Sequence, residues 1–224
     1  TYAVAVIDKE NGRLAAYGGA QYVLDEANIV NIATHPDFRR RGCASGIIDA
    51  LESKNILEDT IIVFCGDNGL AIGQHGLMGK QNVYEHSVHI PLLISGPGIP
   101  AGVKIDKYVY LLDVYPTLCD ICGIEIPASV EGKSFARMFS NTEFESRSDL
   151  YFAFQARIRG ITDGKYKLIE YRTDRLKLTQ LFDLEKDPYE RYNFYDFNSY
   201  DEIVERLRNR MKEYRIEWNE DSHI

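Results

Sequence analysis

The first third of the chain holds short runs of alternating apolar and polar residues between turn-forming residues, which is the pattern of antiparallel strands. We expect strands over residues 2–7, 13–24 and 28–34. The Glu10-Asn11-Gly12 segment between the first two runs favours a hairpin turn. A loop and then an apolar pattern with helical spacing follow, and these predict a helix from about residue 44 to residue 53.

The middle of the chain changes to unbroken apolar runs. Residues 60–65 and 90–95 read Thr-Ile-Ile-Val-Phe-Cys and Ile-Pro-Leu-Leu-Ile-Ser, which is typical of strands buried on both faces of a parallel sheet. Residues 112–122 have helical spacing, with Pro116 in the first turn, where its missing N–H costs nothing. Strands that alternate with helices in this way predict an α/β layer.

The last third has the pattern of a small antiparallel sheet followed by a helix. Residues 157–162 and 165–171 flank Asp163-Gly164, which favours a hairpin with a type I′ turn, and residues 181–184 add a short strand. Ser199 and Glu202 have the spacing of a helix capping box. Behind them lies an amphipathic stripe with helical spacing, formed by Ile203, Leu207, Met211, Tyr214 and Trp218.

Composition and charge narrow the classes of partner. The 224 residues carry a net charge of -8, and the one basic cluster, residues 39–41, is short, so we expect no nucleic-acid partner. We also expect no membrane partner, because no apolar run approaches the roughly 18 residues of a membrane span. No signal peptide is recognisable, although the chain begins with Thr1 rather than Met, as a chain that has lost its leader would. The cytoplasm is therefore only slightly favoured, and the oligomeric state stays open.

Four cysteines are present, and two of them form the Cys119-Asp-Ile-Cys122 motif. The motif lies inside a predicted helix rather than at the start of one after a strand, and no second Cys/His pair completes a zinc tetrad. We expect both cysteines to be small thiols that face the core.

One stretch, residues 65–80, combines residue types that suit a metal and an anion. Asp67 and Asn68 follow an apolar strand, at the strand end where α/β sheets bind ligands. Their side chains offer hard oxygen ligands for Ca²⁺ or Mg²⁺. Lys80, thirteen residues after Asp67, supplies a positive charge for an anionic oxygen. An Asp-Asn pair alone is more often a turn, so the surrounding sequence decides between the two readings.

The surrounding motifs resemble the second half of the sulfatase family, in order and in spacing, over about residues 45–220. They are Asp67-Asn-Gly69, Gly73-Gln-His-Gly-Leu-Met-Gly-Lys80, Tyr84-Glu-His-Ser-Val88, Pro91-Leu-Leu-Ile-Ser-Gly-Pro-Gly-Ile-Pro100, Leu111-Leu-Asp-Val-Tyr-Pro-Thr-Leu118, Glu131-Gly-Lys-Ser134 and Leu181-Phe-Asp-Leu-Glu-Lys-Asp-Pro188, with Glu190 and Asn193.

This resemblance implies an alkaline-phosphatase-like α/β core with a smaller C-terminal α+β subdomain, and the hydrolysis of small-molecule sulfate esters with Ca²⁺ and a cysteine-derived formylglycine nucleophile. It implies that Asp67 and Asn68 are two metal ligands. Lys80 would hold the sulfate and stabilise charge at the leaving oxygen. For His75 two roles stay open, a residue that lines the substrate site and a residue that caps the loop.

The chain departs from the sulfatase pattern in one important respect. The family's nucleophile lies in a Cys-x-Pro-x-Arg motif upstream of the Asp-Asn pair, and none of the four cysteines has a Pro two residues later and an Arg four residues later. Upstream metal ligands have no counterpart either, whereas Ca²⁺ takes six to eight oxygens. We therefore expect weak Ca²⁺ binding and no sulfate ester hydrolysis by this chain alone.

Residues 31–44 resemble a different family, the GNAT acetyltransferases, and among them the ribosomal-protein-alanine acetyltransferases. Arg39, Gly42 and Ala44 match the Arg-x-x-Gly-x-Ala loop that holds the diphosphate of acetyl-CoA. Backbone N–H groups at a helix N-terminus suit that anion. The next strand and helix of that family are replaced here by sulfatase-like sequence, so we do not expect acetyl-CoA chemistry.

Together these patterns predict an α/β chain in three parts. Residues 1–50 form antiparallel GNAT-like strands and a helix, residues 45–145 a partial sulfatase-like sheet with helices, and residues 146–224 the C-terminal α+β subdomain. The favoured function is that of a catalytically incomplete sulfatase homologue. The alternatives are an acetyl-CoA-dependent N-acetyltransferase remnant, a relative of phosphate or phosphonate monoester hydrolases, and an inert fusion.

Overall fold

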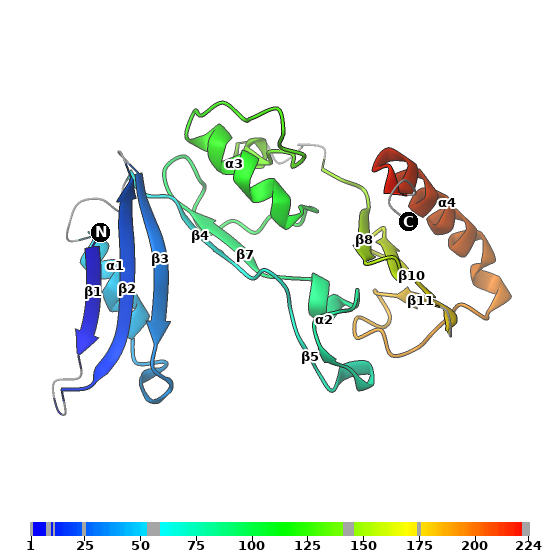
Figure 1. Cartoon of the computed structure of the whole chain (residues 1–224), viewed down its shortest axis with the longest axis horizontal. Coiled ribbons are helices and arrows are strands. Elements are labelled where there is room, and N and C mark those ends of the chain that lie inside the picture. Colours follow the sequence, from blue (N-terminus) through cyan, green and yellow to red (C-terminus); the bar gives the residue numbers. More distant parts are fainter. Residues whose placement is uncertain are drawn as a thin grey trace. The chain divides into compact units, whose positions relative to one another are not determined.

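The computed structural model of the chain (Figure 1) describes residues 2–7, 10, 12–23, 26–52, 59–140, 146–173 and 176–220, with only the backbone course for most of the first three strands. The residues form two compact units. The first comprises Thr1–Val63 and Ile94–Ala101, and the second comprises Phe64–Leu93 and Gly102–Ile224. Among the described residues, no helix combines the length and the apolar character that crossing a bilayer requires.

The first unit contains an antiparallel sheet with one helix, as the sequence predicts. The strands lie in the order β1-β2-β3, with register shifts in both pairings. The helix α1 packs against all three strands, and its Ile47 is buried. The predicted Glu10–Gly12 turn lies partly outside the described residues. The elements are β1 (Tyr2–Ile7), β2 (Leu14–Val23), β3 (Glu26–Thr34), a 3₁₀ helix (Pro36–Phe38) and α1 (Cys43–Glu52).

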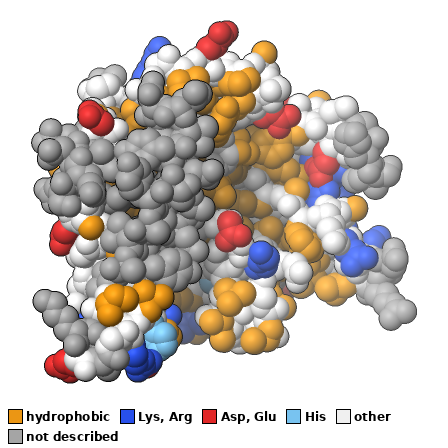
Figure 2. Space-filling model, turned by 60° about the vertical axis from the view of Figure 1, so that its left-hand side comes forward, with side chains coloured by type: hydrophobic (Ala, Val, Ile, Leu, Met, Phe, Trp, Pro, Cys, Tyr) orange, Lys and Arg blue, Asp and Glu red, His pale blue; other side chains and the backbone are white. Residues whose placement is uncertain are grey.

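The two unbroken apolar runs form short strands, β4 (Ile62–Cys65) and β7 (Leu92–Ser95), which pair with each other. Both begin two residues later than expected. The expectation that they are buried on both faces is wrong, because Phe64 is 63% exposed and Leu93 is 60% exposed. A two-stranded sheet has too little neighbouring structure to cover both faces, and hydrophobic side chains reach the surface in Figure 2.

Short elements lie between β4 and the C-terminal sheet. The ribbon β5–β6 is antiparallel, with Ile72 opposite Met78. The helix α3 begins two residues after the predicted start, because the preceding residues form a 3₁₀ helix, and Pro116 lies in its first turn as predicted. The elements are β5 (Ala71–Ile72), 3₁₀ helix Gln74–Gly76, β6 (Met78–Gly79), α2 (Glu85–Val88), 3₁₀ helix Leu111–Asp113, α3 (Val114–Ile121) and 3₁₀ helix Ala136–Phe139.

The C-terminal part is a four-stranded antiparallel sheet in the order β11-β10-β9-β8, and α4 packs against β9 and β10 (Figure 1). The sequence predicts this hairpin and helix but misses β8, and it predicts only the last part of β11. The elements are β8 (Leu150–Phe154), β9 (Ile158–Thr162), β10 (Tyr166–Arg172), β11 (Lys177–Asp183), 3₁₀ helix Asn198–Tyr200 and α4 (Asp201–Glu217).

Two apolar clusters use opposite faces of this sheet. One joins the sheet to α4 and includes Ile161, Leu168, Leu207 and Met211. The other joins the sheet to the segment around α2 and consists of Val83, Tyr84, Ile158, Ile169 and Phe182. Because successive residues of a strand point to opposite faces, Leu168 and Ile169 belong to different clusters. The second cluster fixes the segment that carries the candidate site.

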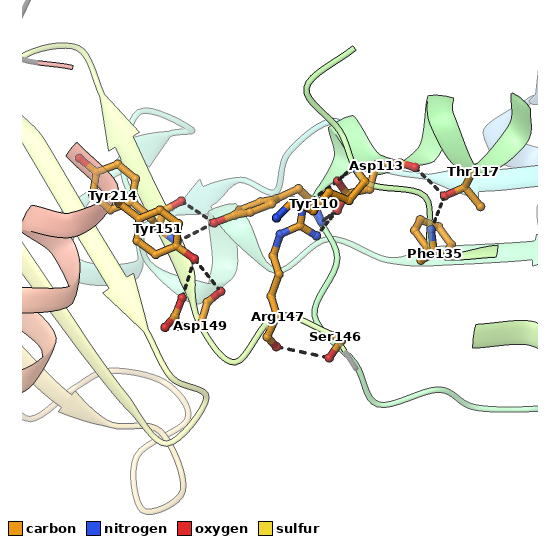
Figure 3. Close-up of polar contacts among 10 residues, drawn as sticks. Tyr110, Asp113, Thr117, Phe135, Ser146, Arg147, Asp149, Tyr151 and Tyr214 are labelled. Carbon is orange, nitrogen blue, oxygen red and sulfur yellow. Dashed lines mark hydrogen bonds and ion pairs between the residues drawn. The ribbon is translucent and has the colours of Figure 1, made fainter. Parts of the chain in front are cut away.

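A buried carboxylate joins the 3₁₀ helix before α3 to the segment that leads into β8 (Figure 3). The side chain of Asp113 is fully buried and accepts two hydrogen bonds from the Arg147 guanidinium, at 2.5 and 2.9 Å. It also accepts the backbone N–H groups of Tyr110 and Lys133. Tyr110 in turn donates its hydroxyl to the carbonyl of Tyr151 in β8. A buried charge is tolerated where its partners satisfy it in this way.

Three local expectations are wrong. A type I′ turn needs positive φ at both central residues, but only Gly164, at φ +90°, has it and Asp163 does not. The expected capping box is absent, because Ser199 lies within a 3₁₀ helix and the residue that caps α4, Tyr200, makes no side-chain capping bond. Of the two cysteines expected to face the core, only Cys119 is buried and Cys122 is exposed.

Candidate functional site

The candidate metal ligands lie in the turn that follows β4. The Asp67 carboxylate accepts the backbone N–H of Asn68 at 2.9 Å. Gly69 donates its N–H to the carbonyl of Ser87, and a Cβ at Gly69 would lie 1.9 Å from the carbonyl oxygen of His86. Only glycine allows the turn to pass this close to α2, so the local sequence fixes the position of Asp67.

The structure brings Asp67 and Lys80 together, as the sequence predicts for residues of one site. Lys80 follows directly after β6, and its Nζ lies 3.9 Å from Oδ2 of Asp67. The side chains are 57% and 81% exposed, respectively. An ion pair this exposed adds little to the free energy of folding. Stability therefore does not explain why the two side chains lie together. Both groups are accessible to a ligand from solvent.

His75 lies at the tip of the β5–β6 ribbon, between Asp67 and Lys80 in the sequence, and it has a left-handed backbone at φ 52°. Its ring stacks on Tyr84 with centroids 3.9 Å apart and planes within 3°. Tyr84 is buried and donates its hydroxyl to Gln180 at 2.7 Å. His86 stacks against both rings. These contacts support the loop-capping role of His75 over the role in the substrate site.

Both histidines favour the neutral imidazole. Burial lowers the pKa of His75 below the ordinary 6.5, against the backbone of Tyr189 and the charge of Asp187, which raise it. Burial, the neighbouring His75 and the Lys167 charge lower the pKa of His86. Neutral rings stack without mutual repulsion, which suits an anchoring contact.

Sequence reasoning missed the buried ion cluster that holds α2 in place. The side chain of Lys167 in β10 is fully buried, and its Nζ lies 2.8 Å from Glu85 and 3.1 Å from Glu190. Glu190 also accepts the backbone N–H of Glu85 at 2.7 Å. The available signal was a lysine inside an apolar strand, since a buried cation requires anionic partners elsewhere in the chain.

The residues that could hold Ca²⁺ are right in kind and too few in number. Asp67 and Asn68 offer hard oxygens, but Ca²⁺ takes six to eight. Over the described part of the chain, no cluster of three or more His, Cys, Asp or Glu residues could hold a metal ion. The Lys80 cation next to Asp67 would also repel a metal ion unless further carboxylates balanced the charge. These residues alone therefore offer Ca²⁺ only a weak and incomplete site.

The candidate acetyl-CoA loop lies in the first unit, where it leads into α1. Arg39 follows the 3₁₀ helix and is exposed, Gly42 has φ +76°, and Ala44 lies in the first turn of α1. Phe38 is buried beneath the guanidinium groups of Arg13 and Arg41. The backbone therefore turns into a helix N-terminus, which is the geometry that the resemblance implies.

The fold defines the class of protein. The chain superposes on the protein BT4656, solved in complex with its substrate D-glucosamine-2-N,6-O-disulfate, with a TM-score of 0.71 and 26% identity over 79% of this chain and 38% of that one. The solved structures it resembles include further sulfatases and two phosphonate monoester hydrolases, and the alkaline-phosphatase-like fold of the sulfatases confirms the predicted fold class.

The family follows from the sequence match. Residues 73–217 match the family model described as N-sulphoglucosamine sulphohydrolase, C-terminal, and the chain therefore belongs to the sulfatase family. Residues 2–66 match the model of the GNAT acetyltransferase family. Both resemblances that the motifs indicate are thus confirmed, as is the order of the two segments.

Curated relatives agree with this assignment. The chain is 35% identical over 162 residues to arylsulfatase K of Rattus norvegicus, and 37% identical over 153 residues to choline-sulfatase of Rhizobium meliloti (strain 1021). Each match covers 66% of this chain, but 28% of the first relative and 29% of the second. The chain thus spans less than a third of the length of these relatives. The roles of Asp67, Asn68, His75 and Lys80 stay predictions.

Proposed function

We propose that this chain contributes part of a sulfate-ester site, in which Asp67 and Asn68 are metal ligands and Lys80 holds the sulfate. The observation that carries the proposal is the 3.9 Å approach of Lys80, which lies within the sulfatase match of residues 73–217, to Asp67 in the turn after β4. At this strand end an exposed carboxylate and an exposed ammonium group lie together. The carboxylate can bind a cation and the ammonium group can bind an anion, so the pair suits a site that takes both.

Lys80 supplies the part of the chemistry that this chain can perform. An ammonium group close to a sulfate oxygen neutralises its charge in the ground state and stabilises the charge that grows on the leaving oxygen. When bound, Ca²⁺ would supply further stabilisation of the same kind. The proposed ligand is a sulfated sugar, in line with the disulfated glucosamine bound by BT4656.

We further propose that the chain does not hydrolyse sulfate esters by itself. No cysteine in the sequence lies in a Cys-x-Pro-x-Arg motif, so the formylglycine nucleophile has no source in these residues. Two oxygen ligands would also hold Ca²⁺ only weakly. In this proposal the chain binds sulfate esters but does not hydrolyse them by itself.

The test is thermal unfolding of the chain with and without Ca²⁺. At ten times Kd a ligand stabilises the folded state by about 1.4 kcal/mol, so millimolar Ca²⁺ should raise Tm by a few degrees. Asp67→Ala should abolish the shift, while Asp106→Ala, at another exposed aspartate, should keep it. A shift that survives Asp67→Ala would overturn the metal assignment. Hydrolysis of an aryl sulfate at a rate that Lys80→Ala leaves unchanged would overturn the assignment of Lys80.

A second candidate function rests on the GNAT match of residues 2–66. In this proposal the loop from Arg39 to Ala44 retains some affinity for acetyl-CoA through backbone N–H groups. Calorimetric titration with acetyl-CoA tests it. Binding that Gly42→Glu abolishes would support the proposal, provided that Gly12→Glu, at another glycine with positive φ and open surroundings, leaves binding intact. Absence of binding would refute it.

A further inference from the structure

The loop between β11 and α4 is held by a buried carboxylate. Asp187 is 3% exposed, and its Oδ2 accepts the backbone N–H of Tyr192 at 2.7 Å. Its Oδ1 lies 3.6 Å from Nε of Arg191. One side chain therefore fixes both the backbone at Tyr192 and the stem of the Arg191 guanidinium, which is itself 67% exposed.

A second buried carboxylate holds the same loop in an unfavourable backbone conformation. Glu190 has φ 55°, in the left-handed region that a residue with a long side chain avoids. Its carboxylate binds Lys167 and the N–H of Glu85, which keep it there. Such strain costs on the order of 1–3 kcal/mol, persists only where the surroundings enforce it, and is concentrated at functional sites.

The side chains that this loop exposes are two tyrosines and an arginine. Tyr189 is 74% exposed and Tyr192 is 61% exposed. The guanidinium of Arg191 lies 5.8 Å from the first ring and 5.7 Å from the second. Aromatic faces take the apolar C–H face of a sugar ring, and an exposed guanidinium takes a sulfate or carboxylate through paired hydrogen bonds.

This surface continues the candidate site. The backbone of Tyr189 interacts with His75, at the tip of the ribbon that ends at Lys80. The five residues from His75 to Lys80 span at most about 17 Å. Tyr189 lies beside one end of this segment and Lys80 forms its other end, so an oligosaccharide that extends along the segment can contact both. Three side chains are too few for a protein interface, which takes roughly 20–30 residues on each side.

We propose that Tyr189, Arg191 and Tyr192 form a subsite that binds a second, anionic sugar ring of a sulfated oligosaccharide whose sulfate ester lies at Lys80. The subsite deepens the proposed function and rests on it for the class of ligand. Arg191 binds the anionic substituent, and the two rings pack against the sugar. Asp187 and Glu190 hold the backbone of this loop, and Asp187 also holds the Arg191 guanidinium, before the ligand arrives, which lowers the entropic cost of binding.

The test is calorimetric titration of the whole chain with a heparin-derived disaccharide that carries N- and 6-O-sulfates, and with the same disaccharide without sulfates. We expect only the sulfated form to bind. Arg191→Gln should weaken its binding about tenfold and Tyr192→Ala about fivefold. The matched controls are Arg206→Gln and Tyr115→Ala, at an exposed arginine and an exposed tyrosine elsewhere, and they should leave Kd unchanged.

Variants at Lys80 separate this proposal from the proposed function. If Lys80→Ala weakens binding and Arg191→Gln does not, the subsite is overturned and the sulfate site stands. If Arg191→Gln weakens binding and Lys80→Ala does not, the subsite stands and the sulfate site is wrong. Absence of binding, or equal binding of the unsulfated disaccharide, overturns the subsite. Unchanged Tm in each variant confirms that a loss of affinity is not a loss of folding.

Discussion

Lys167 is the single residue on which most of the candidate site's support depends. It is fully buried, and it contacts carboxylates from α2 and from the loop that carries Tyr189 and Arg191. Removing one partner of a buried ion pair leaves an uncompensated charge, which costs more than the pair itself contributes. Without Lys167, the carboxylates of Glu85 and Glu190 would be left facing each other. Lys167 therefore links α2, which follows Lys80 in the chain, to the loop that carries the proposed sugar subsite.

We predict that Lys167→Met lowers the free energy of unfolding by about 3–5 kcal/mol, measured by urea denaturation at pH 7. The control is Lys165→Met, two residues earlier, where the lysine pairs with Glu185 on the surface and the midpoint should not move. A loss in Lys167→Met no larger than in the control would show that the cluster is not a structural link.

Glu170 lies in the same strand, β10, and faces the side of the sheet opposite to Lys167. Its ion pairs predict that the free energy of unfolding depends on pH. Burial opposes its ionisation, but the pairs with Arg208 and Arg172 outweigh burial and hold its pKa below the ordinary 4.5. A carboxyl with a lowered folded pKa contributes stability above its unfolded pKa, and the contribution is lost as the pH falls through the folded value. Glu170 therefore stabilises the protein at neutral pH and not in acid.

We predict that Glu170→Gln loses about 1–2 kcal/mol at pH 7, and that the difference from the unchanged chain shrinks once the pH falls below 4.5. Urea unfolding between pH 3 and pH 7 measures it, with the exposed Glu217→Gln as the control. A difference that is constant over this range would contradict the assignment of the shift to Arg208 and Arg172.

At the scale of the elements, the glycine turn after β4 decides where the candidate ligands lie. Gly69 passes so close to α2 that an added Cβ would meet the His86 carbonyl oxygen at 1.9 Å, a backbone atom that cannot rotate away. Gly66, three residues earlier in the same turn, has room, since its nearest contact would be 3.5 Å. The two glycines are therefore a matched pair.

We predict that Gly69→Ala lowers the free energy of unfolding by about 1–3 kcal/mol, as expected for overpacking, and displaces Asp67 from Lys80. Gly66→Ala should be close to neutral. Thermal unfolding measures the first effect, and the Ca²⁺-dependent shift in Tm measures the second. Equal effects of the two substitutions would show that the approach to α2 does not position the turn.

The helices and strands also show how much of the fold the sequence predicts. The turn residues Asp163-Gly164 predict the hairpin of β9 and β10, and helical spacing predicts α4 because one face of this helix packs on the sheet. β8 is missed because its Leu-Tyr-Phe-Ala-Phe sequence does not alternate between polar and apolar residues. The predictions of a type I′ turn at Asp163 and of a capping box at Ser199 are wrong because contacts with neighbouring residues, not local sequence preference, set the backbone there.

The candidate site also has parts that the sequence can predict and parts that it cannot. The proximity of Asp67 and Lys80 could be predicted because a recognisable motif holds both residues and the ribbon between them is short, while their roles stay predictions. The Lys167 cluster joins residues 85, 167 and 190, which no local pattern connects. Sequence spacing also cannot show that Phe64 and Leu93 are exposed, because their exposure depends on which other strands cover the sheet.

At the scale of the whole molecule, the two units have separate cores. In the first, α1 covers the sheet of β1 to β3 and buries Ile47. In the second, the C-terminal sheet has an apolar cluster on each face. The chain leaves the first unit at Val63 and returns to it at Ile94–Ala101, so the units cannot be separated by one cut. Point variants are therefore the better probes of their independence.

We predict that calorimetry resolves two unfolding transitions, because units with their own cores unfold as separate cooperative blocks. Ile47→Ala creates a cavity that costs about 2–5 kcal/mol, and it should lower the midpoint of one transition only. Lys167→Met should lower the midpoint of the other. A single transition that both variants shift alike would mean that the GNAT-like and sulfatase-like segments share one cooperative structure. Two independent shifts would mean that each segment keeps the stability of its own family's core within one chain.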